Sequence, residues 1–312
     1  MCRLTAYFGH STLAADVVTR PTRSVIRQSF DARERLGGSG GQVYDLGNLN
    51  ADGFGLGWYS QDDSEDVTPC VFTEVGPAWH NRNLHRLACK VRSSVIFAHV
   101  RAAGPGMGVC HCSCHPFEYG RFLFMHNGQV AGFKKIRREL MDTLSQCAYD
   151  FCIANSASDS ALAFALFIDQ LDDPHAAISP QHMKMKLTKV IQSLSDALER
   201  HNVNETSLLN FVVTDGNSLA ATRYVINRTK NVPAASLYFS SGTSFEPSLT
   251  PAEAPDMPEG KKCPAVMQEP LREYRMVHED RRDDVVIITS EPLTNVRADW
   301  IPVPKNHIVL VT

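Results

Sequence analysis

Apolar and polar residues alternate with a period of two in several short segments of the first half of the chain. This period is typical of half-buried β-strands, and the clusters of Gly, Pro, Asn and Asp between the segments are typical of turns. The pattern predicts strands at 4–9, 53–60, 70–75, 94–102 and 121–128. The first half of the chain is therefore expected to be rich in strands.

The pattern changes at Phe133, where apolar residues begin to recur every three or four positions. This period predicts two or three helices in the middle of the chain, within 133–144, 158–171 and 183–201. Strand patterns return later, at 208–216, 218–226, 236–242, 284–290 and 307–312. Strands, then helices, then strands are typical of a layered α+β protein rather than of alternating βαβ units.

Two segments have the composition of loops. The segment 247–270 is rich in proline and predicts an exposed surface insertion, because proline disrupts helices and central strands. The glycine cluster at 37–41 predicts a flexible loop beside a site or a plain disordered connector. Strand patterns lie on both sides of the proline-rich segment, so we expect one domain over residues 2–312.

Composition and charge narrow the class of protein. The chain has 312 residues, of which 43% are hydrophobic, with 31 Lys and Arg against 34 Asp and Glu. The formal charge of −3 lacks the basic footprint of a nucleic-acid-binding protein. No apolar stretch approaches the ~18 residues that a membrane-spanning helix needs. The N-terminal segment has no secretory signal pattern, and we expect a cytoplasmic protein.

Cysteines are too sparse for a disulfide scaffold, with nine in the chain. The run 110–115, with sequence CHCSCH, resembles a metal site at first sight. In an extended segment Cys110, Cys112 and Cys114 would share one face, and no second ligand pair of the kind found in structural zinc sites is evident. We therefore predict incidental thiols rather than a metal site, and no cofactor.

Cys2 is the first candidate for chemistry. Removal of Met1 would expose a cysteine that carries both a thiol and an α-amine, and an α-amine has an ordinary pKa of about 7.7 to 8.0. Such an amine can act as the general base for the neighbouring thiol. A cysteine at position two is common by chance, so the motifs that accompany it decide its interpretation.

These motifs are MCRLTAYFG at the start, NADGFGLGWY at 50–59, HVRAAG at 99–104, CHPFEYGRFLFMHNG at 114–128 and SDSALAFALF at 158–167. Their order and separation resemble those of the class II glutamine amidotransferases, which are N-terminal-nucleophile hydrolases. Further segments at 19–36, 77–91, 236–246 and in the C-terminal tail resemble one branch of this family. That branch contains the fungal glutathione-degrading amidotransferase subunit and the bacterial γ-glutamyl hydrolase of ergothioneine synthesis.

The resemblance implies a role for each matched residue. Cys2 would be the nucleophile, and the Asn127 side-chain amide with the Gly128 backbone N–H would form the oxyanion hole. Arg101 would bind the substrate α-carboxylate and Asp159 its α-ammonium group. We place His126 with the substrate-binding residues because it precedes Asn127, and a packed core histidine is its alternative, as for His99.

Each matched residue also has a purely structural interpretation. Arg101 could form a surface ion pair, Asn127-Gly128 is a common hairpin dipeptide, and Asp159 stands where a helix N-cap would be. Asp52 is interpreted as a turn residue whose carboxylate binds backbone N–H groups. The joint occurrence of the motifs in family order favours the functional interpretation.

Three positions depart from the family pattern, namely Gly104, Ser113 and Ala161. They leave the proposed catalytic residues in place and affect the pocket shape and the leaving group. The first hypothesis is hydrolysis of a small-molecule γ-glutamyl substrate, such as glutathione, with a peptidase-like protein partner by analogy. The alternatives are a glutaminase that supplies ammonia to a separate synthase and a catalytically silent regulatory subunit.

The resemblance also implies the fold. It predicts a four-layer αββα sandwich of the N-terminal-nucleophile hydrolase type, in which two antiparallel sheets lie between helical layers. Cys2 is expected at the end of the first strand, and Cys2, Arg101, Asn127 and Asp159 are expected to converge on one cleft.

Overall fold

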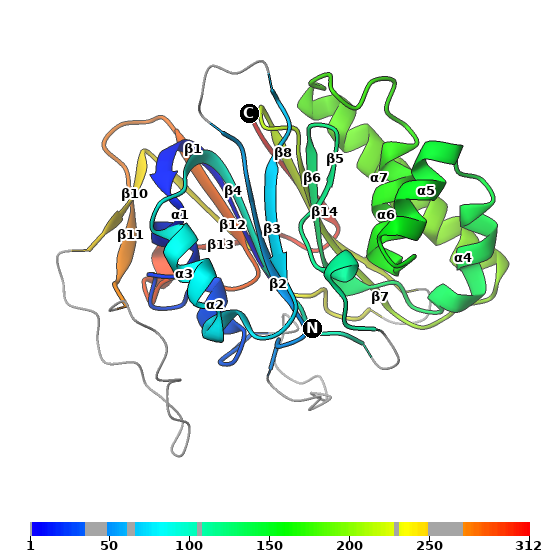
Figure 1. The fold of residues 1–312 in the computed structure, drawn as a ribbon, viewed down its shortest axis with the longest axis horizontal. Coiled ribbons are helices and arrows are strands. Elements are labelled where there is room, and N and C mark those ends of the chain that lie inside the picture. The colour runs from blue at the N-terminus through cyan, green and yellow to red at the C-terminus, as the bar shows by residue number, and fades with distance from the viewer. Residues whose placement is uncertain (1, 35–48, 61–65, 105–107, 228–230, 249–270) are drawn as a thin grey trace.

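A computed structural model describes residues 2–34, 49–60, 66–104, 108–227, 231–248 and 271–312 (Figure 1). The glycine cluster at 37–41 lies outside these residues, and so does the proline-rich segment from 249 onward. The strands on either side of that segment, β10 (Ser244–Pro247) and β11 (Tyr274–Val277), pair with each other in antiparallel orientation.

Two larger antiparallel sheets form the centre of the molecule. The seven-stranded sheet has the order β13 (Ile301–Pro302), β9 (Tyr238–Gly242), β12 (Val285–Thr289), β1 (Arg3–Leu13), β4 (Arg92–Val100), β2 (Phe54–Trp58), β3 (Cys70–Glu74). The five-stranded sheet has the order β14 (His307–Val311), β8 (Leu219–Ile226), β7 (Ser207–Thr214), β6 (Phe122–Gln129), β5 (Phe117–Tyr119). Because β1 lies between β12 and β4, the start of the chain is in the interior of its sheet.

Strand alternation explains how the sheets pack. Leu4 and Ala6 of β1 lie in one apolar cluster with Leu123 and Met125 of β6, so this cluster fills the space between the sheets. Tyr7, the odd-numbered neighbour on β1, belongs instead to the cluster on the outer face. The period of two therefore places one side of each central strand between the sheets and the other beneath helices.

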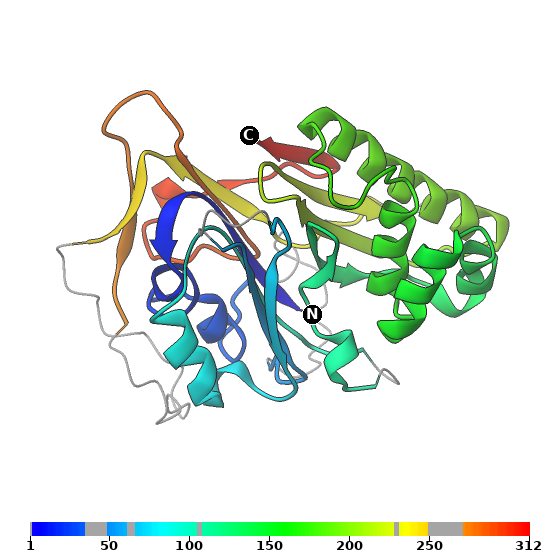
Figure 2. The ribbon, with the colours of Figure 1, turned by 45° about the horizontal axis from the view of Figure 1, so that its top comes forward.

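Helices cover both outer faces, as Figures 1 and 2 show. The seven-stranded sheet is covered by α1 (Ala14–Val18), α2 (Val25–Gln28) and α3 (Arg82–Ala88). The five-stranded sheet is covered by α4 (Phe133–Met141), α5 (Gln146–Ala154), α6 (Asp159–Ile168) and α7 (Pro180–Arg200). Short 3-10 turns lie at Ala78–His80, His111–Ser113 and Arg297–Asp299. The predicted α+β class and the four-layer αββα sandwich are confirmed.

The prediction of two or three helices in the middle was wrong, because α4, α5, α6 and α7 all lie there. The missed helix is α5, whose inward face presents only Ala148 and Cys152 as buried residues. The short helices α1, α2 and α3 were also not predicted. Helices of four to seven residues span too few turns for a period of 3.6 to be detected.

Candidate active site

Cys2 lies directly before β1, as predicted, and only 9% of its surface is exposed. The Ala102 backbone N–H donates to the Cys2 Sγ at 3.4 Å, and the thiol lies 3.7 Å from the Ala102 carbonyl oxygen. The pairing of Arg3 with Val100 in neighbouring strands brings these two segments together. The thiol is therefore held beside the residue that follows Arg101.

Arg101 follows β4 directly and is buried, whereas the surface ion-pair interpretation requires an exposed side chain. Its guanidinium donates to the carbonyls of Asp52 at 3.2 Å and Gly108 at 3.1 Å. The Asp52 carboxylate accepts from the Ala103 N–H at 2.9 Å, so it binds a backbone N–H as expected, but one that lies 51 positions away rather than in its own turn. A guanidinium has five N–H donors, so donors remain for a ligand beyond these two carbonyls.

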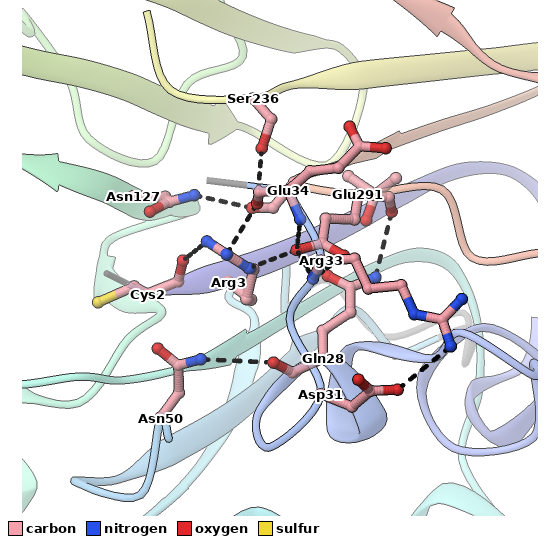
Figure 3. Close-up of polar contacts among 12 residues, drawn as sticks. Cys2, Arg3, Gln28, Asp31, Arg33, Glu34, Asn50, Asn127, Ser236 and Glu291 are labelled. Atoms are coloured by element: carbon pink, nitrogen blue, oxygen red, sulfur yellow. Dashed lines mark hydrogen bonds and ion pairs between the residues drawn. The ribbon is translucent and has the colours of Figure 1, made fainter. Parts of the chain in front are cut away.

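Asn127 is fully buried on β6 and is connected to the strand that Cys2 precedes. Its Nδ2 donates to Ser290 Oγ at 2.8 Å, and Ser290 Oγ also accepts from the Leu4 N–H at 3.0 Å. Figure 3 includes Asn127 and Cys2 in the same set of polar contacts. Within the described part of the chain, Asn127 Oδ1 has no hydrogen-bond partner. One N–H of the Asn127 amide thus fixes its own side chain, and the second N–H remains as a donor for a ligand.

Gly128 lies inside β6 rather than in a hairpin turn. Asn127 pairs with Asn210 and Gly128 with Leu209 along β7, so the hairpin interpretation of this dipeptide was wrong. A Cβ added to Gly128 would lie 1.8 Å from the Leu208 carbonyl oxygen. Only glycine allows the two strands to approach this closely.

Asp159 is the first residue of α6, and the N-cap is Ser158, whose hydroxyl accepts from the Ala161 N–H at 3.1 Å. The buried Asp159 carboxylate accepts from the Val130 N–H at 2.8 Å and from the Ser160 N–H at 2.9 Å. Val130 follows β6 directly, so Asp159 lies next to the strand that carries Asn127 and Gly128. Its oxygens retain lone pairs that can accept from an ammonium group.

Both ring nitrogens of His126 are within hydrogen-bond distance of protein groups. Nδ1 lies 2.9 Å from Ser160 Oγ and Nε2 lies 3.0 Å from the Leu208 carbonyl oxygen. His99 Nε2 lies 3.2 Å from the His126 carbonyl oxygen, across the space between the two sheets. These contacts connect β4, which ends before Arg101, with β6 and the start of α6. These three elements, β4, β6 and α6, are thereby connected to one another.

Three buried histidines lie at this end. Burial lowers the pKa of His99 to about 3, and it lowers the pKa of His115 well below the usual value. Burial also lowers the pKa of His126, although the nearby Asp159 carboxylate opposes this shift. The rings of His99 and His115 lie 4.4 Å apart. All three imidazoles are therefore neutral at pH 7.

The CHCSCH run is not extended, because His111–Ser113 form a 3-10 turn. The side-chain alternation of an extended segment therefore does not apply here, although the Cys110 and Cys112 thiols interact with each other. Burial raises the pKa of the Cys114 thiol to about 11, and this thiol lies 3.6 Å from the Glu74 carbonyl oxygen. Among the described residues, no group of three or more His, Cys, Asp or Glu side chains could hold a metal ion.

A buried cluster of charged residues beside Cys2 was missed by the sequence reasoning (Figure 3). Its centre is Glu291, two residues after the end of β12. Glu291 forms ion pairs with Arg3 at 3.1 Å and with Arg23 at 3.1 Å. Asp31 pairs with Arg23 at 2.9 Å and with Arg27 at 3.5 Å. The spacing of Arg23, Arg27 and Asp31 by four residues was the available signal, since it places charges on one side of a helical turn.

Comparison with known proteins identifies the family. A sequence profile described as "Glutamine amidotransferases class-II" matches residues 40–233, a range that includes Arg101, Asn127 and Asp159. The chain belongs to the class-II glutamine amidotransferases. Members of this family act on carbon–nitrogen amide bonds, and the chain is accordingly an amidotransferase-like hydrolase.

This class-II amidotransferase is similar along its whole length to a yeast protein. The relative is "Probable glutamine amidotransferase DUG3" of Saccharomyces cerevisiae, with 37% identity over 325 residues, covering 100% of this chain and 82% of the relative. The alignment therefore includes Cys2. A second relative is the gamma-glutamyl-hercynylcysteine sulfoxide hydrolase of Mycobacterium tuberculosis, with 29% identity over 130 residues, which are 42% of this chain and 50% of that protein.

Solved structures confirm the fold of this amidotransferase. A glutamine aminotransferase class-II domain protein from Silicibacter pomeroyi superposes with a TM-score of 0.57 at 20% identity, covering 99% of this chain and 94% of that one. An allosteric regulatory enzyme of purine biosynthesis gives a TM-score of 0.51 at 11% identity and covers 99% of this chain; 46% of that chain is matched. Among the described residues, no helix is both long and apolar enough to cross a membrane.

Proposed function

We propose that this amidotransferase hydrolyses the γ-glutamyl amide bond of a small molecule, glutathione or a related γ-glutamyl compound, through a thioester on Cys2. The observation that carries the proposal is the position of the Cys2 thiol, which accepts a hydrogen bond from the backbone N–H of Ala102, next to Arg101. The mycobacterial relative supports the substrate class, because its name describes a γ-glutamyl hydrolase. The mechanism requires that Met1 be removed, so that Cys2 carries a free α-amine.

The reaction follows from the nucleophile and its amine. The amine takes the thiol proton, and the sulfur attacks the γ-carbonyl carbon to form a tetrahedral intermediate. The second Asn127 N–H and the Gly128 backbone N–H bind the oxyanion, for which a preorganised donor contributes about 3 to 4 kcal/mol. The C–N bond then breaks, the leaving amine takes the proton from the α-ammonium group, and water hydrolyses the thioester to release glutamate.

The substrate head group would be bound by opposite charges on the two sheets. Arg101 extends from the seven-stranded sheet and has N–H donors left for an α-carboxylate. Asp159 lies beside the five-stranded sheet and has lone pairs left for an α-ammonium group. His126 supports the Asp159 side of this site through Ser160, and a contact between His126 and the substrate remains a prediction.

The wider setting is also proposed. A single domain over 2–312 is supported by the pairing of β1 with β12, which joins the two ends of the chain in one sheet. A cytoplasmic location is also part of the proposal, supported by a cysteine content too low for a disulfide scaffold. A peptidase-like protein partner remains a proposal by analogy with the fungal subunit.

The test is release of glutamate by protein whose intact mass shows that Met1 is absent. We expect hydrolysis of glutathione or another γ-glutamyl amine to exceed hydrolysis of glutamine, and a glutamyl thioester to be trapped on Cys2 by rapid acid quench. Cys2→Ala is expected to abolish both signals. Cys152→Ala, which removes a buried thiol of α5, is expected to retain them.

The alternatives predict different results. A glutaminase that supplies a synthase would release ammonia from glutamine faster than glutamate from γ-glutamyl peptides. A silent subunit would release neither. Full activity of Cys2→Ala would overturn the thioester mechanism, and activity of the chain alone would show that a partner is not required.

A further inference from the structure

Arg3 is the residue through which the buried charged cluster reaches Cys2. Its side chain is fully buried, and its Nη1 donates to the carbonyl oxygen of Cys2 at 2.9 Å. Its Nη2 donates to the Glu34 carbonyl oxygen at 2.8 Å, and its Nε lies 3.1 Å from Glu291 Oε1. Figure 3 shows the guanidinium among these three acceptors, with the Cys2 sulfur pointing away from it. The guanidinium therefore contacts the backbone of Cys2 and leaves the thiol unobstructed.

Glu291 holds this guanidinium in place. Besides Arg3, its carboxylate binds Arg23 at 3.1 Å and accepts from the backbone N–H groups of Arg33 at 3.0 Å and Glu34 at 2.9 Å. Glu291 is itself only 1% exposed. A buried carboxylate with this many donors has little rotational freedom, so it fixes the plane of the Arg3 guanidinium.

The same cluster is anchored at its other end. The Glu34 side chain forms an ion pair with Arg297 and accepts from the Tyr238 hydroxyl. Glu34 accepts from Arg3 through its carbonyl, and its side chain is connected to β9 and to the 3-10 turn at Arg297–Asp299. The Cys2 carbonyl is thus held by a network that extends over several elements of the seven-stranded layer.

The carbonyl of Cys2 determines where its reacting groups lie. The Cα of Cys2 carries both the α-amine and the thiol and is attached to this carbonyl carbon, so movement of the peptide plane between Cys2 and Arg3 displaces both groups. A chain terminus is ordinarily mobile. The hydrogen bond from Arg3 to the carbonyl oxygen restrains this peptide plane, and the Ala102 N–H restrains the thiol.

We propose that Arg3 is a positioning residue for the nucleophile: held by Glu291 and the Glu34 carbonyl, it fixes the Cys2 carbonyl and thereby aims the thiol and the α-amine at the substrate. The proposal rests on the function proposed above for Cys2. A buried ion network is weak evidence for stability, because replacing such a network by apolar side chains is often neutral. Its contact with the nucleophile's own backbone supports a geometric role instead.

The test compares Arg3→Met with Arg121→Met. Arg121 is a buried arginine of the other sheet layer, and its guanidinium donates to the carbonyls of Asp215 at 2.8 Å and His175 at 3.4 Å. Both substitutions remove a buried guanidinium that binds backbone carbonyls. Arg3→Met leaves the Glu291–Arg23 pair in place, so it is the mildest way to release the Cys2 carbonyl. Arg3→Lys serves as the second variant if the methionine variant does not fold.

Two quantities are measured on each variant. We expect Arg3→Met to lower kcat by about tenfold to a hundredfold with KM nearly unchanged, because misplacement of a reacting group by about 1 Å has effects of this size. We also expect slower alkylation of Cys2 by iodoacetamide, followed by peptide mass spectrometry. Arg121→Met is expected to change neither quantity, and Arg3→Lys, which can reach fewer acceptors, is expected to lie between wild type and Arg3→Met.

An unchanged kcat and alkylation rate in Arg3→Met would overturn the inference, as would an equal loss in Arg121→Met. Alkylation requires no substrate, so it separates this inference from the proposed function. Slower alkylation in Arg3→Met together with no γ-glutamyl hydrolysis by the wild type would remove the proposed function and support the positioning role.

Discussion

The two helical layers of the molecule are packed in different ways. In the layer over the five-stranded sheet, all ten residues of α6 are buried, and Phe124 stacks on Phe164 with ring centroids 4.9 Å apart. In the layer over the seven-stranded sheet, the short helix α2 buries Arg27 and Gln28 beside the ion network of Glu291. The first layer contributes apolar burial, which is not directional. The second places directional bonds next to Cys2, so we expect the two layers to differ in what they control.

The largest effects are expected from substituting one residue in each helical layer. Phe167→Ala in α6 is expected to lower the free energy of unfolding by about 3 to 5 kcal/mol through lost burial and a cavity. Glu291→Gln is expected to cost about 3 to 5 kcal/mol as well, because it removes the buried carboxylate that Arg3 and Arg23 share. Only Glu291→Gln should also lower kcat. Chemical denaturation and steady-state kinetics on the folded fraction measure these effects.

A loss of kcat in Phe167→Ala equal to that in Glu291→Gln would remove the distinction between the layers. In that case both substitutions would act through general loosening of the fold. An unchanged free energy of unfolding in Glu291→Gln would show instead that the ion network exists for geometry alone.

The second prediction uses two buried asparagines that face each other across β6 and β7. Asn127 pairs with Asn210, and each has an Oδ1 without a hydrogen-bond partner in the described part of the chain. Alanine at either position is expected to lower the free energy of unfolding by about 1 to 3 kcal/mol, because buried partners lose their bonds. Only Asn127→Ala should lower kcat, by about 100- to 1000-fold, since it removes an oxyanion donor.

Asn210 is the matched control because its Nδ2 donates to the backbone carbonyls of Ala235 and Ser236, whereas Asn127 Nδ2 donates to the Ser290 hydroxyl. Equal kcat values in the two variants would argue against Asn127 as the oxyanion donor. Circular dichroism and denaturation midpoints would verify that both variants are folded during the assay.

The smallest expected effect concerns the buried histidines. Burial lowers the pKa of His115 in the folded protein, so as pH falls below about 6.5 the unfolded chain binds a proton that the folded protein does not. Stability therefore decreases with falling pH, by about 1.4 kcal/mol per pH unit for each such histidine. His115→Phe is expected to reduce this loss between pH 7 and pH 5.5 by about 1.4 kcal/mol.

Denaturation at the two pH values measures this effect. His182→Gln, an exposed position of α7, is the control and should show the same pH dependence as the wild type. An unaltered pH dependence in His115→Phe would mean that His115 is already protonated in the folded protein or stays neutral when the chain unfolds.

Much of the fold could be predicted from the sequence because its central elements have strong periodicity. The alternation in β1, β4 and β6 follows directly from their position between a core and a helical layer. The helix α5 lacked such a signal, since only Ala148 and Cys152 face inward along it. A short stripe of small residues does not distinguish a helix from a loop.

The candidate site was predicted only in part, because only some of its residues lie within local motifs. Arg101, Asn127 and Asp159 lie within compact motifs, so local sequence identifies them. The pair of Arg3 and Glu291 joins residues at opposite ends of the chain, and charged residues are ordinarily exposed. Only the antiparallel pairing of β1 with β12 brings these two charges into contact.

The bond between the Leu4 N–H and Ser290 Oγ has a consequence for synthesis of the protein. These residues are 286 positions apart, and Ser290 is also the partner of Asn127. At a ribosomal rate of about 5 to 20 residues per second, Ser290 is made roughly 15 to 60 seconds after Leu4. A nascent chain therefore carries Cys2 for most of its synthesis without the groups that complete its surroundings. The surroundings of Cys2 are therefore complete only after β12 and Ser290 have been made.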